Sequence, residues 1–150
     1  DRLRNEQSTA FENVNYDGIY DLNKPFTIQA ETAYILKDET EIVYMNNMHV
    51  IMNLSNGGVV NITSAKGRFN KETYDCFFEE DVKATDGETE IFAENLDLLA
   101  TKNFIEAYND VRLIYTRGSL KADIINYDFE TKRFKVSMFD DKTVKMKVIK

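Results

Sequence analysis

Apolar and polar residues alternate along most of this chain, which is the pattern of strands that are buried on one face. In residues 134–138, Phe, Val and Met occupy every second position, with Lys and Ser between them. The same period of two recurs in residues 111–115 and in residues 144–148. Alternation of this kind predicts strands, and no long segment shows the 3.6-residue period of an amphipathic helix, so we expect an all-β fold.

The alternating segments are copies of one repeating unit. Each unit carries a residue pair in which Asn or Asp precedes an apolar residue, and the apolar members of successive pairs are 34, 34 and 29 residues apart. We interpret this pair as the end of a unit. Because a single unit cannot bury its apolar face alone, we expect successive units to stack and share one core. The pairs are Asn13-Val14, Asn47-Met48, Asp81-Val82 and Asp110-Val111.

In every unit a small residue follows an apolar residue at a distance of two. A small side chain permits a bend, so we expect the chain to cross from one sheet to the other at these positions. Gly-containing turn sequences lie at 55–58, 85–88 and 116–118. The small positions are Ala30 after Ile28, Ser64 after Ile62, Ala93 after Ile91 and Ala122 after Leu120.

Stacked units of this kind predict an elongated antiparallel two-sheet β-taco, or β-jelly roll, that is open at both ends. We assign residues 11–150 to one such domain. We expect the polar residues 1–10 to be disordered or to trail from an N-terminal membrane anchor outside this sequence. The period-two phase predicts which side chains face the trough between the sheets. These are Ile28, Ile35, Ile62, Phe69, Ile91, Leu98, Leu113, Leu120, Tyr127, Phe134, Val136 and Met138.

Charge and cysteine content narrow the possible functions. The formal net charge of −7 argues against a nucleic-acid partner, because phosphate contacts need Lys and Arg. Cys76 is the only cysteine, so neither an intrachain disulfide nor a cysteine zinc site can form, and we interpret it as a small buried residue. No apolar run approaches the ~18–20 residues of a membrane-spanning helix.

The sequence shows no cluster of catalytic residues. His49 is the only histidine, which removes Ser-His and Cys-His nucleophile pairs and His-rich metal sites. Carboxylates are densest at 77–81 and 139–141, and we interpret these acids, together with Asp86, as solvated turn residues. We therefore expect no enzyme activity, no cofactor and no metal. A glycan-active jelly roll with two carboxylates facing each other in the trough stays open as an alternative.

Two stretches resemble the periplasmic domain of the LptC family of lipopolysaccharide export. The opening stretch, "FENVNYDGIYDLNKPFTIQAETAYI", is similar to the first strands of that family, and "GSLKADIINYDFETKRFKVSMF" looks like a later repeat. The resemblance extends from Phe11 to Lys150, and LptA and part of LptD use the same OstA-type repeat. The matching residues are Asn13, Val14, Tyr16, Phe26, Ile28, Ala30, Ala33, Leu120, Ala122, Asp123, Asp128 and Thr131.

The resemblance implies a periplasmic domain, anchored to the inner membrane by an N-terminal helix, that holds lipopolysaccharide acyl chains in an apolar trough. It would receive them from an LptB/F/G-type transporter at its N-terminal edge and pass them to an LptA-like protein. Two alternatives remain: a soluble LptA-like bridge protein, and a structural β-solenoid or adhesin-like module whose core is filled by its own side chains.

The end of the chain predicts a docking edge. In "TVKMKVIK", Val144, Met146 and Val148 alternate with lysines, which is typical of an edge strand with one apolar face. We expect this strand to pair with the next OstA-type protein, since strand addition supplies main-chain hydrogen bonds to a partner. The predicted docking segment extends from Asp140 to Lys150.

Overall fold

The computed structural model describes residues 8–20, 24–138 and 145–148, and within them the chain is all-β. This confirms the predicted fold class. None of the described residues belongs to a helix long and apolar enough to cross a membrane. The strands are β1 (Ser8–Tyr20), β2 (Lys24–Leu36), β3 (Glu39–Asn53), β4 (Val59–Asn70), β5 (Cys76–Thr85), β6 (Glu90–Leu98), β7 (Ile105–Tyr115), β8 (Gly118–Asp128), β9 (Arg133–Ser137) and β10 (Lys145–Val148).

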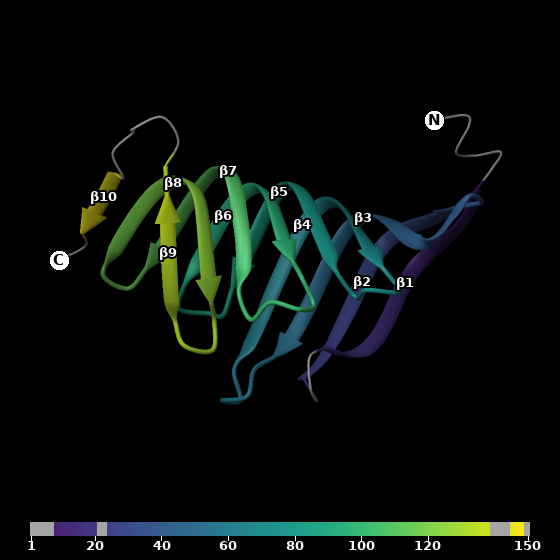
Figure 1. Cartoon of the computed structure of the whole chain (residues 1–150), viewed down its shortest axis with the longest axis horizontal. Helices are drawn as coiled ribbons and strands as arrows, with labels where there is room; N and C mark the ends of the chain where they lie inside the picture. The colour runs from purple at the N-terminus through teal and green to yellow at the C-terminus, as the bar shows by residue number, and fades with distance from the viewer. Residues whose placement is uncertain (1–7, 21–23, 139–144, 149–150) are drawn as a thin grey trace.

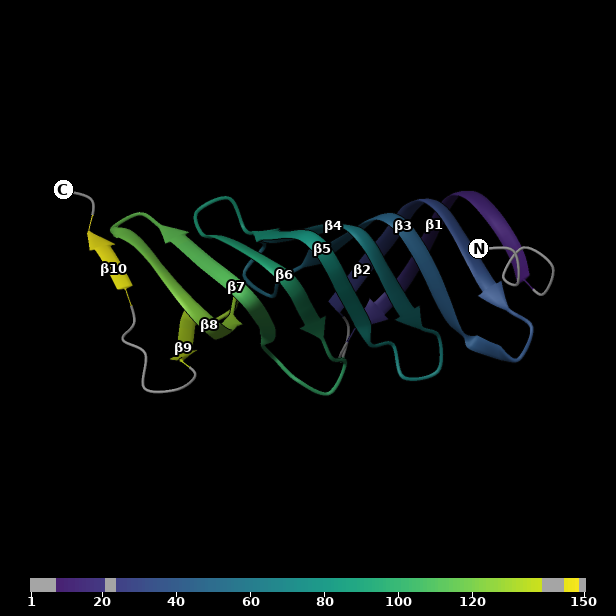
Figure 2. The ribbon, with the colours of Figure 1, turned by 90° about the horizontal axis from the view of Figure 1, so that it is seen from above.

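Each strand pairs antiparallel with the next one along the chain, from β1 to β8. The edge of β8 is then shared by two short strands, because β9 pairs with residues 124–128 and β10 with residues 118–121. The strands follow one another along the long axis, so β1 and β10 lie at opposite ends of the molecule (Figures 1 and 2). β1 begins at Ser8, so residues 8–10, which we expect to be frayed, belong to a strand, and residues 1–7 lie outside the described part.

The two predicted layers are halves of one continuous sheet that is folded along a corner. The long strands β1, β3, β5 and β7 each have one or two residues with positive φ near their middle, and the strand pairing skips a position there. Non-Gly residues seldom adopt this conformation, and Asn and Asp adopt it most readily. The corner residues are Asn13, Asn47, Glu80, Asp81, Asn109 and Asp110.

The corner corrects our interpretation of the repeat. The Asn or Asp of each marker pair does not end a unit but turns the strand from one half of the sheet into the other. The small residues lie beside the corner rather than at it: Ala30 pairs with Val14 and with Met48, the first residues past the turn. They are buried on the inner side, where the two halves come closest.

The corner divides the sheet into two half-sheets that face each other across the trough. We call residues 14–20, 24–30, 48–64, 82–93 and 111–122 the first half-sheet, and residues 8–12, 32–46, 66–79, 95–108 and 124–137 the second. The mouth of the trough lies opposite the corner. Turns 54–58, 86–89 and 116–117 border the mouth on the first side, and turns 37–38, 71–75, 99–104 and 129–132 border it on the second.

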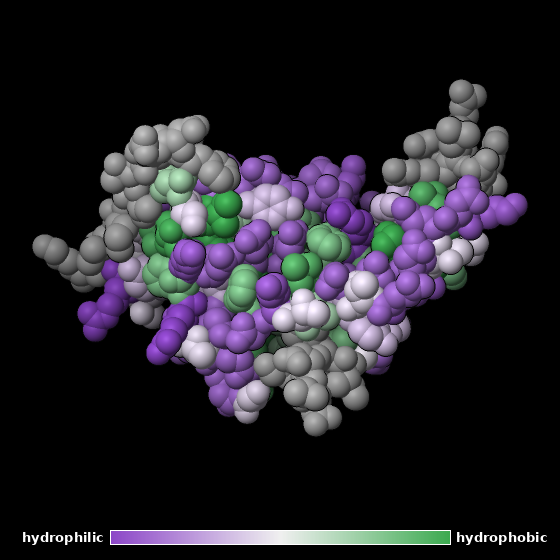
Figure 3. Space-filling model, in the orientation of Figure 1, coloured by the Kyte–Doolittle hydropathy of each residue, from purple (hydrophilic) through white to green (hydrophobic). Residues whose placement is uncertain are grey.

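The inner faces of the two half-sheets form one apolar core. Most of the residues predicted to face inward are buried there. Ile35, Val136 and Met138 are partly buried against the core, whereas Phe134 keeps 40% of its surface exposed because it lies on the short edge strand β9. The face seen in Figure 3 is largely hydrophilic, with apolar residues scattered among the polar ones. The buried predicted residues are Ile28, Ile62, Phe69, Ile91, Leu98, Leu113, Leu120 and Tyr127.

Candidate functional site

The centre of the trough is filled by the protein's own side chains. Ile62, Ile91 and Leu113 have no exposed surface, and they come from strands β4, β6 and β7 of the first half-sheet. Among the described residues, Ser64 and Thr89 are the polar residues that are buried as whole residues, and neither carries a carboxylate. A pair of carboxylates facing each other inside the trough, as the glycan-active alternative requires, is therefore not found in this part of the chain.

The trough is hollowed at its N-terminal end. β1 is the last strand on this side within the described chain, so its inward side chains have strand β2 on one side only. Phe11 is 44% exposed and Tyr16 is 37% exposed, although both belong to the inward row. They border an open, mostly apolar hollow of about 730 Å³. Its other lining residues include Val14, Ala33, Ile35, Val43, Met45 and Phe69.

Aromatic rings meet across the mouth at this N-terminal end. Phe69 of the second half-sheet lies 5.3 Å from Tyr16 and 6.3 Å from Phe26, measured between ring centroids, and both partners belong to the first half-sheet. Tyr74, in a turn at the mouth, lies 6.3 Å from Phe69. The hydrophobic part of these contacts is non-directional, so other apolar groups can replace one of the rings.

Polar contacts join the two sides of the mouth in the C-terminal half. The ammonium group of Lys132 lies 3.2 Å from Asp86 Oδ2 and 2.8 Å from Glu88 Oε2. The Tyr127 hydroxyl donates to Thr89 Oγ1 at 3.2 Å, and the backbone N–H of Ser55 donates to Glu130 Oε1 at 2.7 Å. We call this set of contacts the clasp. Its members are Ser55, Asp86, Glu88 and Thr89 on the first side, with Tyr127, Glu130 and Lys132 on the second.

Asp86 is the anchor of the clasp, and the expectation that it is a solvated turn residue is wrong. Its side chain is only 5% exposed, and its Oδ1 accepts the backbone N–H groups of Glu88 and Thr89, both at 2.9 Å. Burial alone would raise the pKa of Asp86. The two backbone hydrogen bonds and the bond from Lys132 outweigh burial, so the pKa is lowered and the carboxylate stays charged.

Lys132 is the other half of this ion pair. It has a φ of 60° in the turn after β8, where Asp128 Oδ1 accepts the N–H groups of Glu130 and Thr131. Hydrogen bonds to Glu88 and Asp86 raise the pKa of Lys132. The turn conformation therefore holds the ammonium group over the mouth. Only an indirect signal for this contact is visible in the sequence, namely a Gly-containing acidic turn and a Lys, with Asp86 and Lys132 46 residues apart.

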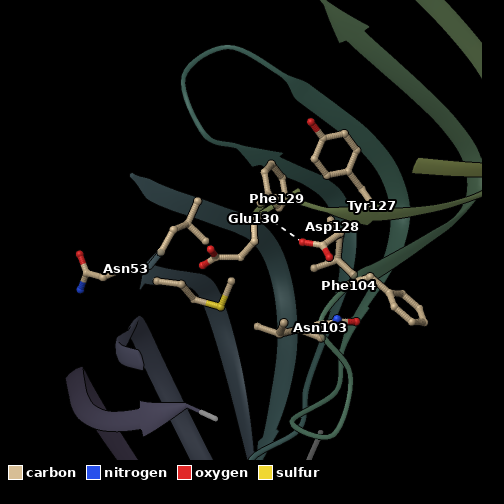
Figure 4. A pocket seen from close by; sticks show the side chains of 11 residues that line it. Asn53, Asn103, Phe104, Tyr127, Asp128, Phe129 and Glu130 are labelled. Carbon is tan, nitrogen blue, oxygen red and sulfur yellow. Dashed lines mark hydrogen bonds between the residues drawn. The ribbon is translucent and has the colours of Figure 1, made fainter. Parts of the chain in front are cut away.

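Beneath the clasp is a narrow apolar crevice between the two sides of the mouth (Figure 4). Its empty volume is about 420 Å³ when the space at its opening is included. Phe104, Phe129 and Tyr127 come from the second side, and Asn53 lies opposite them on the first. The remaining lining residues are Met52, Leu54, Leu98, Asn103, Ile105, Asp128 and Glu130.

Cys76 and His49 have structural positions, and the interpretation of Cys76 as a small buried residue is confirmed. Cys76 is 1% exposed in the core and burial raises its pKa, which suppresses thiolate formation. His49 Nε2 and Asn61 Oδ1 are 2.8 Å apart across adjacent strands, on the outer face. In the acidic run 77–81, Glu80 and Asp81 shape the corner rather than a turn. The described residues hold no group of three or more His, Cys, Asp or Glu that could bind a metal ion.

The predicted docking edge is described only in part. Val144 and most of the segment from Asp140 to Lys150 lie outside the described residues. Met146 and Val148 belong to β10, where Met146 pairs with Leu120 and Val148 with Gly118 of β8. Because β10 already covers that half of the β8 edge, a partner strand at this end would have to pair with the outer edge of β10 or of β9. Docking itself stays a prediction.

About two thirds of this chain matches a known protein family. The family model described as "Lipopolysaccharide-assembly, LptC-related" matches residues 40–138, which is about two thirds of the chain. The match extends from β3 to the end of β9 and includes the clasp and the crevice. No curated protein matches this chain.

Proposed function

The chain belongs to the LptC-related family of lipopolysaccharide assembly, and from this premise we propose that it holds lipopolysaccharide acyl chains between its half-sheets during transport. It would act in the periplasm as a bridge component, anchored to the inner membrane by a helix that precedes residue 1. Its N-terminal edge would receive lipid from an LptB/F/G-type transporter. Its C-terminal edge would pass the lipid to an LptA-like protein.

The observation that carries this proposal is the unbroken apolar lining. The inward side chains of both half-sheets form one apolar cluster from Phe26 near the N-terminal end to Phe129 near the C-terminal end. At the N-terminal end this lining reaches the surface in the hollow beside Phe11 and Tyr16. An acyl chain that enters the hollow therefore meets apolar side chains along its whole path.

The packed centre implies that the half-sheets move apart when lipid enters. Transfer of a CH₂ group from water to an apolar site contributes ~0.8 kcal/mol, so a dozen of them would contribute about 10 kcal/mol if fully dry. Parting the half-sheets offsets part of this transfer free energy. Side-chain contacts such as that between Tyr16 and Phe69 are lost and replaced by contacts with the acyl chain. The net affinity is then low enough for release, which a bridge protein requires.

A structural module without a ligand is the second candidate. The observation that favours it is the same packed centre, in which Ile62, Ile91 and Leu113 leave no exposed surface. It does not account for the half-exposed inward aromatic residues of β1, which a purely structural end unit would be expected to cover with polar groups.

Site-specific photo-crosslinking in cells tests the proposal. A photoreactive amino acid is placed at the inward positions Ile35 and Val136, and at their neighbours Tyr34 and Lys135 on the outer face as matched controls. We expect lipopolysaccharide to be captured at Ile35 and Val136 and not at Tyr34 or Lys135. Equal capture at inward and outward positions, or none at any of them, would contradict binding between the half-sheets.

A further inference from the structure

We propose that the crevice beneath the clasp is a lateral port, through which an acyl chain passes across the mouth of the trough without travelling to either end. This inference rests on the proposed function, because it assigns an additional route to the same apolar interior. The clasp then decides when the route is open.

The crevice is continuous with the core. Leu98, Ile105 and Phe129 line it and also belong to the buried core cluster, so no polar layer separates the two. Leu98 and Ile105 are paired in the register of β6 and β7. The ring centroids of Phe129 and Tyr127 are 4.6 Å apart. A chain that passes the mouth here would lie directly among residues of the trough.

Three of the polar residues at the rim, Tyr127, Asp128 and Glu130, are engaged in hydrogen bonds within the protein, and the walls are mostly apolar, so an apolar chain is the fitting occupant. Asp128 Oδ1 accepts the backbone N–H groups of its own turn, and Glu130 Oε1 accepts the N–H of Ser55. Tyr127 donates to Thr89. A polar ligand would have to displace these bonds, whereas an acyl chain needs only the apolar walls.

Apart from Tyr127, near the end of β8, the clasp joins turns, and this makes it the place where the mouth opens. Opening at the corner would break the main-chain pairing of β4 with β5 and of β6 with β7. Opening at the mouth breaks no main-chain strand pairing; it breaks the polar contacts of Lys132, Tyr127 and Glu130 with the opposite side and separates apolar side chains of the core, which an entering acyl chain can contact instead. Lys132 is half exposed, so its ion pairs are partly screened by water and exchange readily.

Cys76 is a built-in reporter of this opening. The residue is 1% exposed, and its neighbours in the sheet are Phe69 of β4 and Leu98 of β6, which lines the crevice. A thiol reagent reacts with it only when the interior opens. Labelling through local opening is insensitive to low concentrations of urea, whereas labelling through global unfolding increases with urea.

The first experiment measures the labelling rate of Cys76 in Lys132→Met, Lys132→Arg and Lys66→Met variants. Lys66→Met is the matched control, because it removes a surface ion pair with Glu80 at 3.3 Å that does not cross the mouth. We expect Cys76 to be labelled about threefold to tenfold faster in Lys132→Met than in the wild-type protein. This rate should not change at low concentrations of urea. Lys132→Arg and Lys66→Met should label at the wild-type rate. An unchanged rate in Lys132→Met would overturn the clasp as a closure.

The second experiment tests passage of an acyl chain, with cis-parinaric acid as the fluorescent probe. Ser55→Cys and Glu130→Cys are combined with Cys76→Ala, and the two thiols are joined by a short reducible bis-thiosulfonate cross-linker. We expect slower uptake of the probe in the cross-linked protein, recovery after reduction, and faster uptake in Lys132→Met. Equal rates in all forms would overturn the port and leave the proposed function intact. No uptake in any form would overturn both.

Discussion

The two ends of the mouth are closed by different chemistry, although the same strand pattern builds both. At the N-terminal end, Tyr16 and Phe69 meet across the mouth, and no polar contact is involved in that pair. In the C-terminal half, Lys132 bridges to Asp86 and Glu88, and Tyr127 bonds Thr89. The N-terminal hollow is open to solvent, whereas the C-terminal crevice lies beneath the clasp.

The difference teaches that strands and turns have separate roles in this fold. The strands supply the apolar lining at both ends, so the lining is uniform. The turns contribute fewer side chains to the trough, Phe129 among them, so their polar residues can differ, and these residues set how firmly each part of the mouth is held. Loss of an aromatic contact should therefore affect the N-terminal end through packing, and loss of a charge should affect the C-terminal half through opening.

The largest expected effect comes from removing the aromatic centre of the N-terminal closure. Phe69→Ala should lower the free energy of unfolding by about 3–5 kcal/mol, because Phe69 is 1% exposed and its loss leaves a cavity. Phe134→Ala is the control, since Phe134 is 40% exposed on β9 and should cost far less. Urea unfolding measures both. Similar losses for the two variants would mean that the N-terminal end is not held by this packing.

The inner side of the corner should resist added bulk. Ala122→Leu should cost about 1–3 kcal/mol, because Ala122 is 6% exposed beside the corner and faces Val111. Glu79→Ala, at an exposed position on β5, should change stability by less than about 0.5 kcal/mol. Thermal unfolding compares them. Equal melting temperatures would contradict the close approach of the half-sheets at Ala122.

The backbone conformation at the corner makes a smaller contribution to the free energy of unfolding. The corner is common to the N-terminal and C-terminal halves of the sheet. Asn47 has a φ of 54°, so Asn47→Ala should destabilise the protein by about 1 kcal/mol, whereas Asn47→Gly should be neutral or slightly stabilising. The comparison uses urea unfolding of the two variants. A greater loss for Gly than for Ala would show that the Asn side chain, and not its backbone conformation, matters at the corner.

The smallest stability effect belongs to the clasp, and it depends on pH. Lys132→Met should cost about 1 kcal/mol or less at pH 7, since the ion pair is partly exposed. The pKa of Asp86 is lowered in the folded protein, so the contribution of its charge is present above the unfolded-state pKa and is lost as pH falls through the folded value. The stability difference between Lys132→Met and Lys132→Arg should therefore shrink on acidification below pH ~4. If the stability difference between the two variants persists in acid, it arises from packing of the side chain at position 132 and not from the ion pair.

The strand positions of the trough could be predicted from sequence because alternation directly encodes burial. Ile62 and Leu98, assigned inward from their phase, are buried in the core. Phe134 has the same phase and is still 40% exposed, because its strand is a short edge strand. Phase identifies a face of a strand, but it does not show what covers that face.

The corner and the clasp depend on information that hydropathy does not contain. The recurring Asn or Asp was visible as a repeat marker, but its role follows from a backbone conformation, as the φ of 54° at Asn47 shows. Asp86 and Lys132 meet only after the sheet folds on itself, so neither residue's neighbours in sequence indicate the contact. Whether the lining residues hold lipid stays a prediction.

A distance across the trough tests the central claim most directly. Spin labels are attached at Thr63→Cys, on the outer face of the first half-sheet, and at Glu106→Cys, on the outer face of the second, in a Cys76→Ala background. Pulsed electron paramagnetic resonance then measures their separation with and without lipopolysaccharide. If acyl chains enter between the half-sheets, the distance increases when lipopolysaccharide binds. An unchanged distance in protein that has bound lipopolysaccharide would place the acyl chains outside the trough and contradict the account.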